Sequence, residues 1–377
     1  MNARDENRSC ELPAGRRNLR QASCSSLRIL LAALCLAGLP HASPSTGEAD
    51  QLRDEMQRRE MVDRGLQYLF SIQNEGAVGD TRKKAVTSLF VLSCLSSGIQ
   101  PSHPEQGQSL QDAYNWIIKN SSAAFFGGRE QPSHDHALAG LMLTELVGTC
   151  AVQKENQKLY EKARRALGYS QQIQDKGIGG DYFGGWRPND RTKVNSRMLT
   201  TWFLLQLRST QLRGMPVSKS SLARAVEFVE ASQKLGKMEK ANEKGGFSVD
   251  ARGLPVLSAT AAGTAVLSLF DPDKSRLSAA RNWLSRHPPQ WYGPNFYESN
   301  YFAVCGLYRS RHSDRGEAYK KYFDRLSQML KERQEPDGSW PFPPGHGGPI
   351  LAMGKGYSTA MAILILNVDR GFLPMDQ

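Results

Sequence analysis

The stretch Gln334-Glu335-Pro336-Asp337-Gly338-Ser339-Trp340 joins two segments with different apolar patterns. Before it, Leu326, Met329 and Leu330 have the i, i+3, i+4 spacing of an amphipathic helix with one buried face. After it, Thr359–Leu366 is apolar on nearly every side, which is typical of a helix in a protein interior. Glycine allows a tight reversal of the chain, and the indole ring covers the exposed end of the helix. This stretch therefore predicts a hairpin of one half-polar helix and one wholly apolar helix.

The same hairpin pattern occurs six times along the chain. The bulky residues of the amphipathic segments are spaced 48, 53, 59, 55 and 46 residues apart, at Tyr68, Trp116, Tyr169, Phe228, Trp283 and Met329. The apolar segments are Ala85–Leu95, His136–Leu146, Met198–Leu207, Ser258–Leu269, Tyr301–Tyr308 and Thr359–Leu366. Six such pairs predict an all-α (α/α)6 toroid, with an inner apolar ring and an outer amphipathic ring. An open solenoid is the alternative, but solenoids usually need polar terminal caps and the sixth copy here is the most regular.

The first fifty residues do not follow the repeat. Ile29–Leu39 is an apolar run that follows several arginines, and the small residues and prolines of 40–44 come after it. This order is typical of a secretory signal peptide. We therefore expect an exported protein, periplasmic or extracellular, with a leader and signal peptide at 1–43, a linker at 44–56 and a single toroid domain at 57–377. An uncleaved N-terminal anchor is the alternative.

Composition excludes several classes of protein. The 40% hydrophobic content and mixed charge of the 377 residues exclude a disordered chain, and six cysteines in so long a chain exclude a small disulfide scaffold. The cysteines of the toroid region, Cys94, Cys150 and Cys305, lie among apolar neighbours, as buried thiols do. No apolar stretch approaches the roughly 18–20 residues that span a bilayer.

The net charge of +11 bears on the partners of the protein. The basic residues are not interleaved with aromatics in a stripe, so we expect no nucleic-acid partner. A basic surface instead fits association with a membrane surface or an anionic polymer.

The glycine-rich loops resemble the QW repeat of squalene and oxidosqualene cyclases and of protein prenyltransferase β subunits. The repeat residues are Gln174, Gly185, Trp186, Gly246, Phe247, Gln334, Gly338 and Trp340. The region from about Met61 to Pro374 resembles bacterial exported prenyltransferase/squalene-oxidase repeat proteins, which share the stretch Tyr357-Ser358-Thr359-Ala360-Met361-Ala362 and a closing Leu373-Pro374. The resemblance implies the toroid fold and a structural role for the repeat residues. It is not specific for any reaction.

The motifs for the reactions of these relatives are not in the sequence. It contains neither the Asp-x-Asp-Asp acid of the cyclases nor the Asp-Asp-x-x-Asp motif that binds magnesium; the nearest stretch is Asp271-Pro272-Asp273-Lys274. Where prenyltransferases have their zinc ligands, residues Gly253–Thr260 supply no thiol or carboxylate. We therefore expect no metal and no cofactor.

The polar residues that remain near the starts of inner helices are candidates for a site. Asp135 and Glu298 are candidate catalytic acids or bases, because apolar surroundings and neighbouring imidazoles shift a carboxyl pKa. Their alternative role is capping in the first turn of a helix. The candidate cavity or ligand residues are His134, His136, Arg197, Tyr297, Tyr301 and Tyr357. Aromatic faces stabilise a carbocation or line an apolar site, and plain packing or local pairing is the alternative. In a helix, the two histidines diverge by about 200° and do not readily share a metal.

Three functions remain open. The first is an exported toroid that binds an apolar, isoprenoid-like small molecule or an envelope protein, without cyclase or zinc chemistry. The second is a divergent squalene or terpene cyclase-like isomerase or lyase that uses Asp135 or Glu298 as its acid. The third is a polysaccharide-active (α/α)6 enzyme, which needs two carboxylates about 5–10 Å apart. The fold alone does not choose among them.

Overall fold

The computed structural model describes residues 46–175, 183–192, 194–236, 243–250, 253–270, 274–293, 295–345, 348–373 and 375. The chain divides into two compact units between Arg53 and Asp54, and the repeats lie in the second unit. The predicted leader and signal peptide at 1–43, as well as Asp271-Pro272-Asp273 and Pro374, lie outside the described residues.

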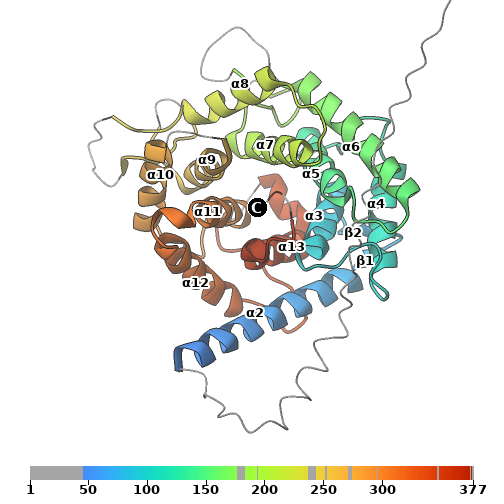
Figure 1. Ribbon diagram of the computed structural model, residues 1–377, viewed down its shortest axis with the longest axis horizontal. Helices are drawn as coiled ribbons and strands as arrows, with labels where there is room; N and C mark the ends of the chain where they lie inside the picture. Colours follow the sequence, from blue (N-terminus) through green and yellow to red (C-terminus); the bar gives the residue numbers. More distant parts are fainter. Residues whose placement is uncertain are drawn as a thin grey trace, which may run out of the picture. The chain divides into compact units, whose positions relative to one another are not determined.

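Two concentric rings of helices form the second unit (Figure 1). The inner ring consists of α3 (Lys83–Ser96), α5 (Pro132–Leu146), α7 (Arg197–Leu212), α9 (Leu257–Phe270), α11 (Phe296–Arg309) and α13 (Gly354–Asn367). Each inner helix packs against the next and α13 packs against α3, so the ring is closed. The outer ring consists of residues 54–71 of α2 (Thr46–Ser71), together with α4 (Gly107–Lys119), α6 (Gln153–Ile173), α8 (Lys219–Glu230), α10 (Lys274–Arg286) and α12 (Glu317–Lys331). The predicted (α/α)6 toroid is confirmed.

Short elements complete the described part of the unit. Strands β1 (Gln73–Asn74) and β2 (Ala77–Val78) form an antiparallel pair after α2. Three 3-10 helices, η2 (Arg311–Ser313), η3 (Gly348–Met353) and η4 (Val368–Arg370), flank α11 and α13. Because each outer helix is followed by an inner helix that runs back, the inner helices all begin at one end, which we call the N-terminal end of the ring.

Burial follows the apolar patterns of the sequence. In α13 every residue from Gly356 to Asn367 is buried, whereas α12 buries only Tyr322, Phe323, Leu326 and Leu330. By length and hydropathy alone, Leu351–Arg370 passes as a membrane span, which the sequence analysis did not find, but 78% of it is buried inside the protein. Its apolar character is therefore that of the core. Cys94 and Cys305 are buried and Cys150 is half-buried, and no disulfide joins any two of them.

The glycine-rich loop after α12 closes the ring. Gln334 donates hydrogen bonds from its amide nitrogen to the carbonyl of Met61 in α2 at 2.8 Å and to that of Gly338 at 3.0 Å. Gly338 has a φ of 88°, and a Cβ there would lie 2.3 Å from the carbonyl oxygen of Arg64. Trp340 donates from its indole nitrogen to the carbonyl of Leu330 at 2.8 Å. The last hairpin is thereby tied to the first outer helix.

Two earlier loops repeat this arrangement. Gln174 bonds the carbonyl of Ser221 in the next outer helix at 2.8 Å, and Gln233 bonds that of Arg276 in the same way. Trp186 donates its indole N–H to the carbonyl of Ser170 at 2.8 Å, and Phe247 is fully buried. A Cβ on Gly185 would lie 2.7 Å from the ring of Phe228, and one on Gly246 would lie 2.6 Å from the ring of Trp283. The repeat residues thus occupy structural positions between adjacent hairpins.

Candidate functional site

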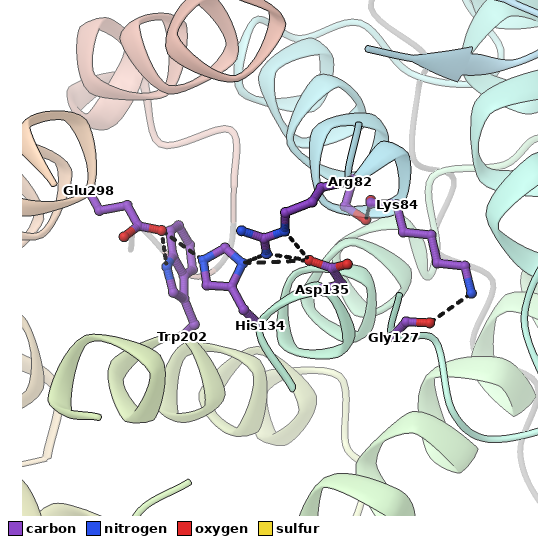
Figure 2. A network of polar contacts seen from close by, with 8 residues as sticks. Arg82, Lys84, Gly127, His134, Asp135, Trp202 and Glu298 are labelled. Carbon is purple, nitrogen blue, oxygen red and sulfur yellow. Dashed lines mark hydrogen bonds and ion pairs between the residues drawn. The ribbon is translucent and has the colours of Figure 1, made fainter. Parts of the chain in front are cut away.

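Four ionisable side chains meet inside the N-terminal end of the ring (Figure 2). Arg82 directly precedes α3, His134 and Asp135 lie in the first turn of α5, and Glu298 lies in the first turn of α11. Their exposed fractions are 8%, 7%, 1% and 3%. Ionisable groups are rarely buried this deeply unless they are paired. Because α11 lies across the centre from α5, the group spans the interior of the ring (Figure 1).

Arg82 and Asp135 form one pair in this network. The guanidinium donates from Nε to Oδ1 of Asp135 at 3.1 Å, and its Nη2 also contacts that oxygen. The backbone of Arg82 has φ 44° and ψ 40°, a left-handed conformation that is uncommon for a residue with a side chain. Gly128 lies against the other carboxylate oxygen, since a Cβ there would be 2.4 Å from Oδ2. The loops before α3 and α5 therefore hold this pair in place.

His134 and Glu298 form the second pair. The imidazole Nε2 lies 2.8 Å from Oε1 of Glu298, and Trp202 of α7 donates its indole N–H to the same oxygen at 3.1 Å. Burial opposes the charge of Glu298, but the hydrogen bond and charge of His134 together with Trp202 outweigh it and lower the pKa of the carboxyl. Burial also opposes a charged His134, but hydrogen bonding with Asp135 and Glu298 outweighs it and raises the pKa of the imidazole. The geometry suits a proton on Nε2 that is donated to an ionised Glu298.

Nδ1 of His134 connects the two pairs. It lies 2.8 Å from Nη2 of Arg82 and 3.9 Å from Oδ1 of Asp135. In the neutral ring Nδ1 accepts a hydrogen bond from Arg82. When Nδ1 also carries a proton, the charges of Arg82, His134, Asp135 and Glu298 sum to zero. The Arg82 N–H that pointed at Nδ1 must then turn toward Asp135. The ring of His134 separates the two carboxylates, so their nearest oxygens are no more than about 9 Å apart.

Aromatic side chains surround Glu298. Tyr357 of α13 is fully buried, and its hydroxyl lies close to Glu298. Burial and the nearby charge of Glu298 raise the pKa of this phenol well above its usual value. Tyr301 stacks on Trp202 with ring centres 5.6 Å apart. Tyr297 instead donates its hydroxyl to the carbonyl of Pro341 at 2.6 Å, which fixes the loop before α13.

Two of the candidate residues face away from this network. His136 points between the rings, where its Nδ1 accepts the backbone N–H of Phe126 at 3.1 Å and its Nε2 lies 3.1 Å from the hydroxyl of Ser170. Burial lowers the pKa of His136 to about 4, so the ring is neutral. Arg197 stacks its guanidinium over Phe228 of α8, 4.9 Å from the ring centre, instead of facing the centre. This first residue of α7 therefore lies on the side of its helix that faces the outer ring.

Arg82 and Trp202 are not among the site residues predicted from the sequence. Arg82 carried a weak signal, because it stands with Lys83 and Lys84 at the start of an inner helix. Trp202 carried none, since it lies within an apolar segment. In the described part of the chain, no three His, Cys, Asp or Glu side chains are grouped so that they could hold a metal ion.

A cleft of about 420 Å³ reaches the network from the side of α3 and α5. Its lining includes Arg82 and Asp135, so solvent approaches the buried charges here. A second cleft of about 460 Å³ lies between the start of α5 and the end of α6, next to Ser133, and its lining includes Phe125 and Tyr169. Both open at the N-terminal end of the ring.

No protein-family model matches the sequence, and no curated protein matches it either. Solved structures do match. The GH76A α-1,6-mannanase of Salegentibacter sp. HEL1_6 has a TM-score of 0.57 at 8% identity, over 83% of this chain and 99% of that one. A sugar epimerase from a ruminal bacterium has a TM-score of 0.57 at 12% identity, over 85% and 99%. A polysaccharide lyase has a TM-score of 0.54 at 10% identity, over 82% and 96%.

These likenesses show the fold alone. The chain shares the (α/α)6 toroid fold of these enzymes. The narrower resemblance to squalene cyclases and prenyltransferases stays a prediction.

Proposed function

We propose that the protein is a carbohydrate-active enzyme that acts on a polysaccharide, and that His134 and Glu298 carry its proton chemistry. The observation behind this proposal is the buried contact of 2.8 Å between His134 Nε2 and Glu298 Oε1, joined to Arg82 and Asp135. Export, as the N-terminal segment predicts, would bring such an enzyme to polysaccharides of the cell envelope or its surroundings.

Stability does not explain the network. Replacing a buried ion pair by well-packed apolar residues is often neutral or stabilising, and the ring around these charges is otherwise apolar. Groups whose pKa values are shifted by burial and by specific partners gather at sites of chemistry. Glu298 is held ionised while His134 is held ready to carry a proton, so the pair supplies a base and an acid at neutral pH.

The sugar substrate is supported by the chemistry that such groups perform. Hydrolysis, elimination and epimerisation of sugars all move a proton through a positioned acid or base. Hydrolysis by two carboxyl groups needs room between them for the scissile bond, and the ring of His134 fills the space between Asp135 and Glu298, so the acid and base proposed here are His134 and Glu298 instead. The matched structures are named as a mannanase, an epimerase and a lyase, which favours a sugar over an isoprenoid.

A terpene cyclase fits this site poorly. Protonation of an alkene needs a carboxylic acid that carries a proton, whereas the lowered pKa of Glu298 keeps that carboxyl ionised and Asp135 is bonded to a guanidinium. A non-catalytic toroid is the second candidate, because both carboxylates already have partners within the protein. In that case the network holds α3, α5 and α11 together, and the protein binds an isoprenoid-like ligand or an envelope protein.

The test is a product assay on the purified chain. It is incubated with neutral and anionic polysaccharides, and new reducing ends, new carbon–carbon double bonds and changed sugar configuration are measured. Glu298→Gln and His134→Gln each remove one proton carrier, so we expect a loss of at least about 100-fold in rate. Glu161→Gln, on the exposed face of α6, is the matched control and should keep full activity. Absence of product with the unaltered protein on every polysaccharide, or full activity in Glu298→Gln, contradicts the proposal.

A further inference from the structure

We infer that the substrate carries an anionic group and that the cleft at the start of α3 binds it. This inference rests on the proposed carbohydrate substrate and specifies its chemical class. We call this cleft the basic cleft, and it is lined by Arg82, Lys83, Lys84, Trp116, Gly128, Arg129, Glu130 and Asp135. Its volume of about 420 Å³ suits one or two sugar units.

Positive charge predominates on the walls of the basic cleft. Arg82 and Asp135 neutralise each other, which leaves Lys83, Lys84 and Arg129 against the single carboxylate of Glu130. Lys84 is half-buried, and Figure 2 shows its side chain extending to Gly127, whose carbonyl accepts a hydrogen bond from Nζ at 2.9 Å. No carboxylate of the described residues lies within ion-pair distance of that ammonium. Two of its three N–H groups therefore remain for an anion.

The backbone at this place adds to the positive field. α3 begins at Lys83 and has neither an acidic residue in its first turn nor a side-chain cap. The positive end of its helix dipole is therefore uncompensated, and the residues that begin the helix are those that line the cleft. A carboxylate or sulfate on a sugar would meet both the side-chain cations and this helix end.

A third cleft, separate from the one beside Ser133, adjoins the basic cleft at Trp116. It is lined by Gln73, Glu75, Gly76, Asp112, Asn115, Trp116, Lys119 and Asn120, has a volume of about 820 Å³, and shares Trp116 with the basic cleft. The half-buried indole offers a flat apolar face of the kind that the C–H face of a pyranose ring packs against, and amides and carboxylates beside it suit sugar hydroxyls. Because Glu75 and Asp112 outnumber Lys119 in this cleft, it suits uncharged units of a polymer whose anionic group lies in the basic cleft. The basic cleft leads to Asp135, which belongs to the buried network.

The test measures binding separately from turnover. Three oligosaccharides of equal length are titrated by calorimetry: a uronic acid oligomer, a sulfated oligomer and a neutral mannan oligomer. We expect one of the two anionic oligomers to bind, with a dissociation constant that rises with salt concentration. Lys84→Gln should weaken that binding about tenfold, the size of one charged hydrogen bond. Arg129→Gln, at an exposed position, should weaken it less.

Lys331→Gln is the matched control, because Lys331 is exposed at the end of outer helix α12, away from the basic cleft. It should leave the affinity unchanged. The uronic and sulfated arms identify which anion is recognised, and tight binding of either supports the inference. The inference is wrong if the neutral oligomer binds as tightly as the anionic ones. It is also wrong if neither Lys84→Gln nor Arg129→Gln weakens the binding of the anionic oligomer.

The two proposals fail in different ways. If the protein converts a neutral polysaccharide and ignores the anionic ones, the inference about the basic cleft is wrong and the proposed function stands. If an anionic oligomer binds through Lys84 but is never converted, the cleft is as inferred and the proposed enzyme is wrong. Thermal unfolding of each variant separates loss of binding from loss of fold, and the exposed Arg129→Gln gives a second variant if Lys84→Gln does not fold.

Discussion

The two faces of α5 place histidines two residues apart in opposite environments. On the inward face, His134 contacts Arg82 and Glu298, and its pKa is raised. On the outward face, His136 lies between Phe126 and Ser170, and its pKa falls to about 4. Both imidazoles are almost completely buried. Burial alone therefore does not decide the charge of a buried histidine, because the carboxylates across the ring reverse its effect at His134.

The same contrast separates a packing role from a chemical one. His136 has neutral partners that fix one tautomer, in which Nε2 carries the proton and Nδ1 accepts from Phe126. This arrangement ties α5 to the outer helix α6 and moves no proton. His134 has a carboxylate on one nitrogen and a guanidinium on the other, so its Nδ1 takes up a proton only when the Arg82 N–H turns away from it. The inward face is therefore the one suited to catalysis.

Glu298→Ala should have the largest effect on stability. It leaves His134 without its carboxylate in the interior, and breaking a buried pair in this way costs about 3–5 kcal/mol in the free energy of unfolding. Urea unfolding measures the loss. Glu161→Ala, which breaks an exposed pair with Arg164, is the control and should cost less than about 1 kcal/mol. Equal losses in the two variants would mean that His134 and Glu298 are not paired in solution.

The pH dependence of stability should divide between the two histidines. The folded pKa of His136, about 4, lies below the unfolded value of 6.5, so only the unfolded chain takes up a proton between these values. Stability conferred by His136 is complete above pH 6.5 and falls by about 3 kcal/mol as the pH drops to 4. His134 behaves oppositely, because its folded pKa is raised. Its contribution is complete below pH 6.5 and is lost as the pH rises through the folded value.

Urea unfolding curves recorded on both sides of pH 6.5 test the two expected effects, the loss of stability at acid pH from His136 and the loss at alkaline pH from His134. His136→Phe should remove the acid-side slope attributed to His136 while leaving the alkaline side unchanged. His134→Gln should remove the loss of stability on the alkaline side and leave the acid side unchanged. NMR titration of the two rings gives the pKa values directly. Retention of the acid-side slope in His136→Phe would show that another group titrates there and that the neutral state of His136 is not responsible.

Much of the fold was predictable because apolar spacing is a local property. The six apolar segments named from the sequence each fall inside one observed inner helix, since an all-round apolar helix is stable only in the interior. Glutamine and glycine before Trp340 likewise indicated a hairpin, in which Gln334 bonds the carbonyl of Gly338 and Trp340 bonds that of Leu330. Each of these features depends on residues that are close in sequence.

The pairings in the site were not predictable in this way. His134, Asp135 and Glu298 were named because they are polar residues near the starts of inner helices, but 164 residues separate His134 from Glu298. Their contact depends on how ring closure brings α5 opposite α11. The left-handed backbone of Arg82, which directs its guanidinium inward, and the indole N–H of Trp202 depend equally on the tertiary structure. Arg197 was expected at the centre, yet it lies over Phe228.

Ser170→Ala should have the smallest effect and the most selective one. The hydroxyl lies 3.1 Å from Nε2 of His136 and donates to Gln206 at 2.9 Å, so its loss leaves one buried imidazole N–H without a partner. We expect a cost of about 1–2 kcal/mol in urea unfolding, with the NMR titration of His134 unchanged. Trp202→Phe removes the matching donor on the inward face, the N–H that Glu298 accepts at 3.1 Å, and should instead alter the titration of His134. If the two faces of α5 are independent, the unfolding costs of these substitutions add to within about 0.5 kcal/mol in the double variant. A larger coupling would mean that Ser170, through α5, also positions His134, and the outward face would then share in the chemistry of the inward one.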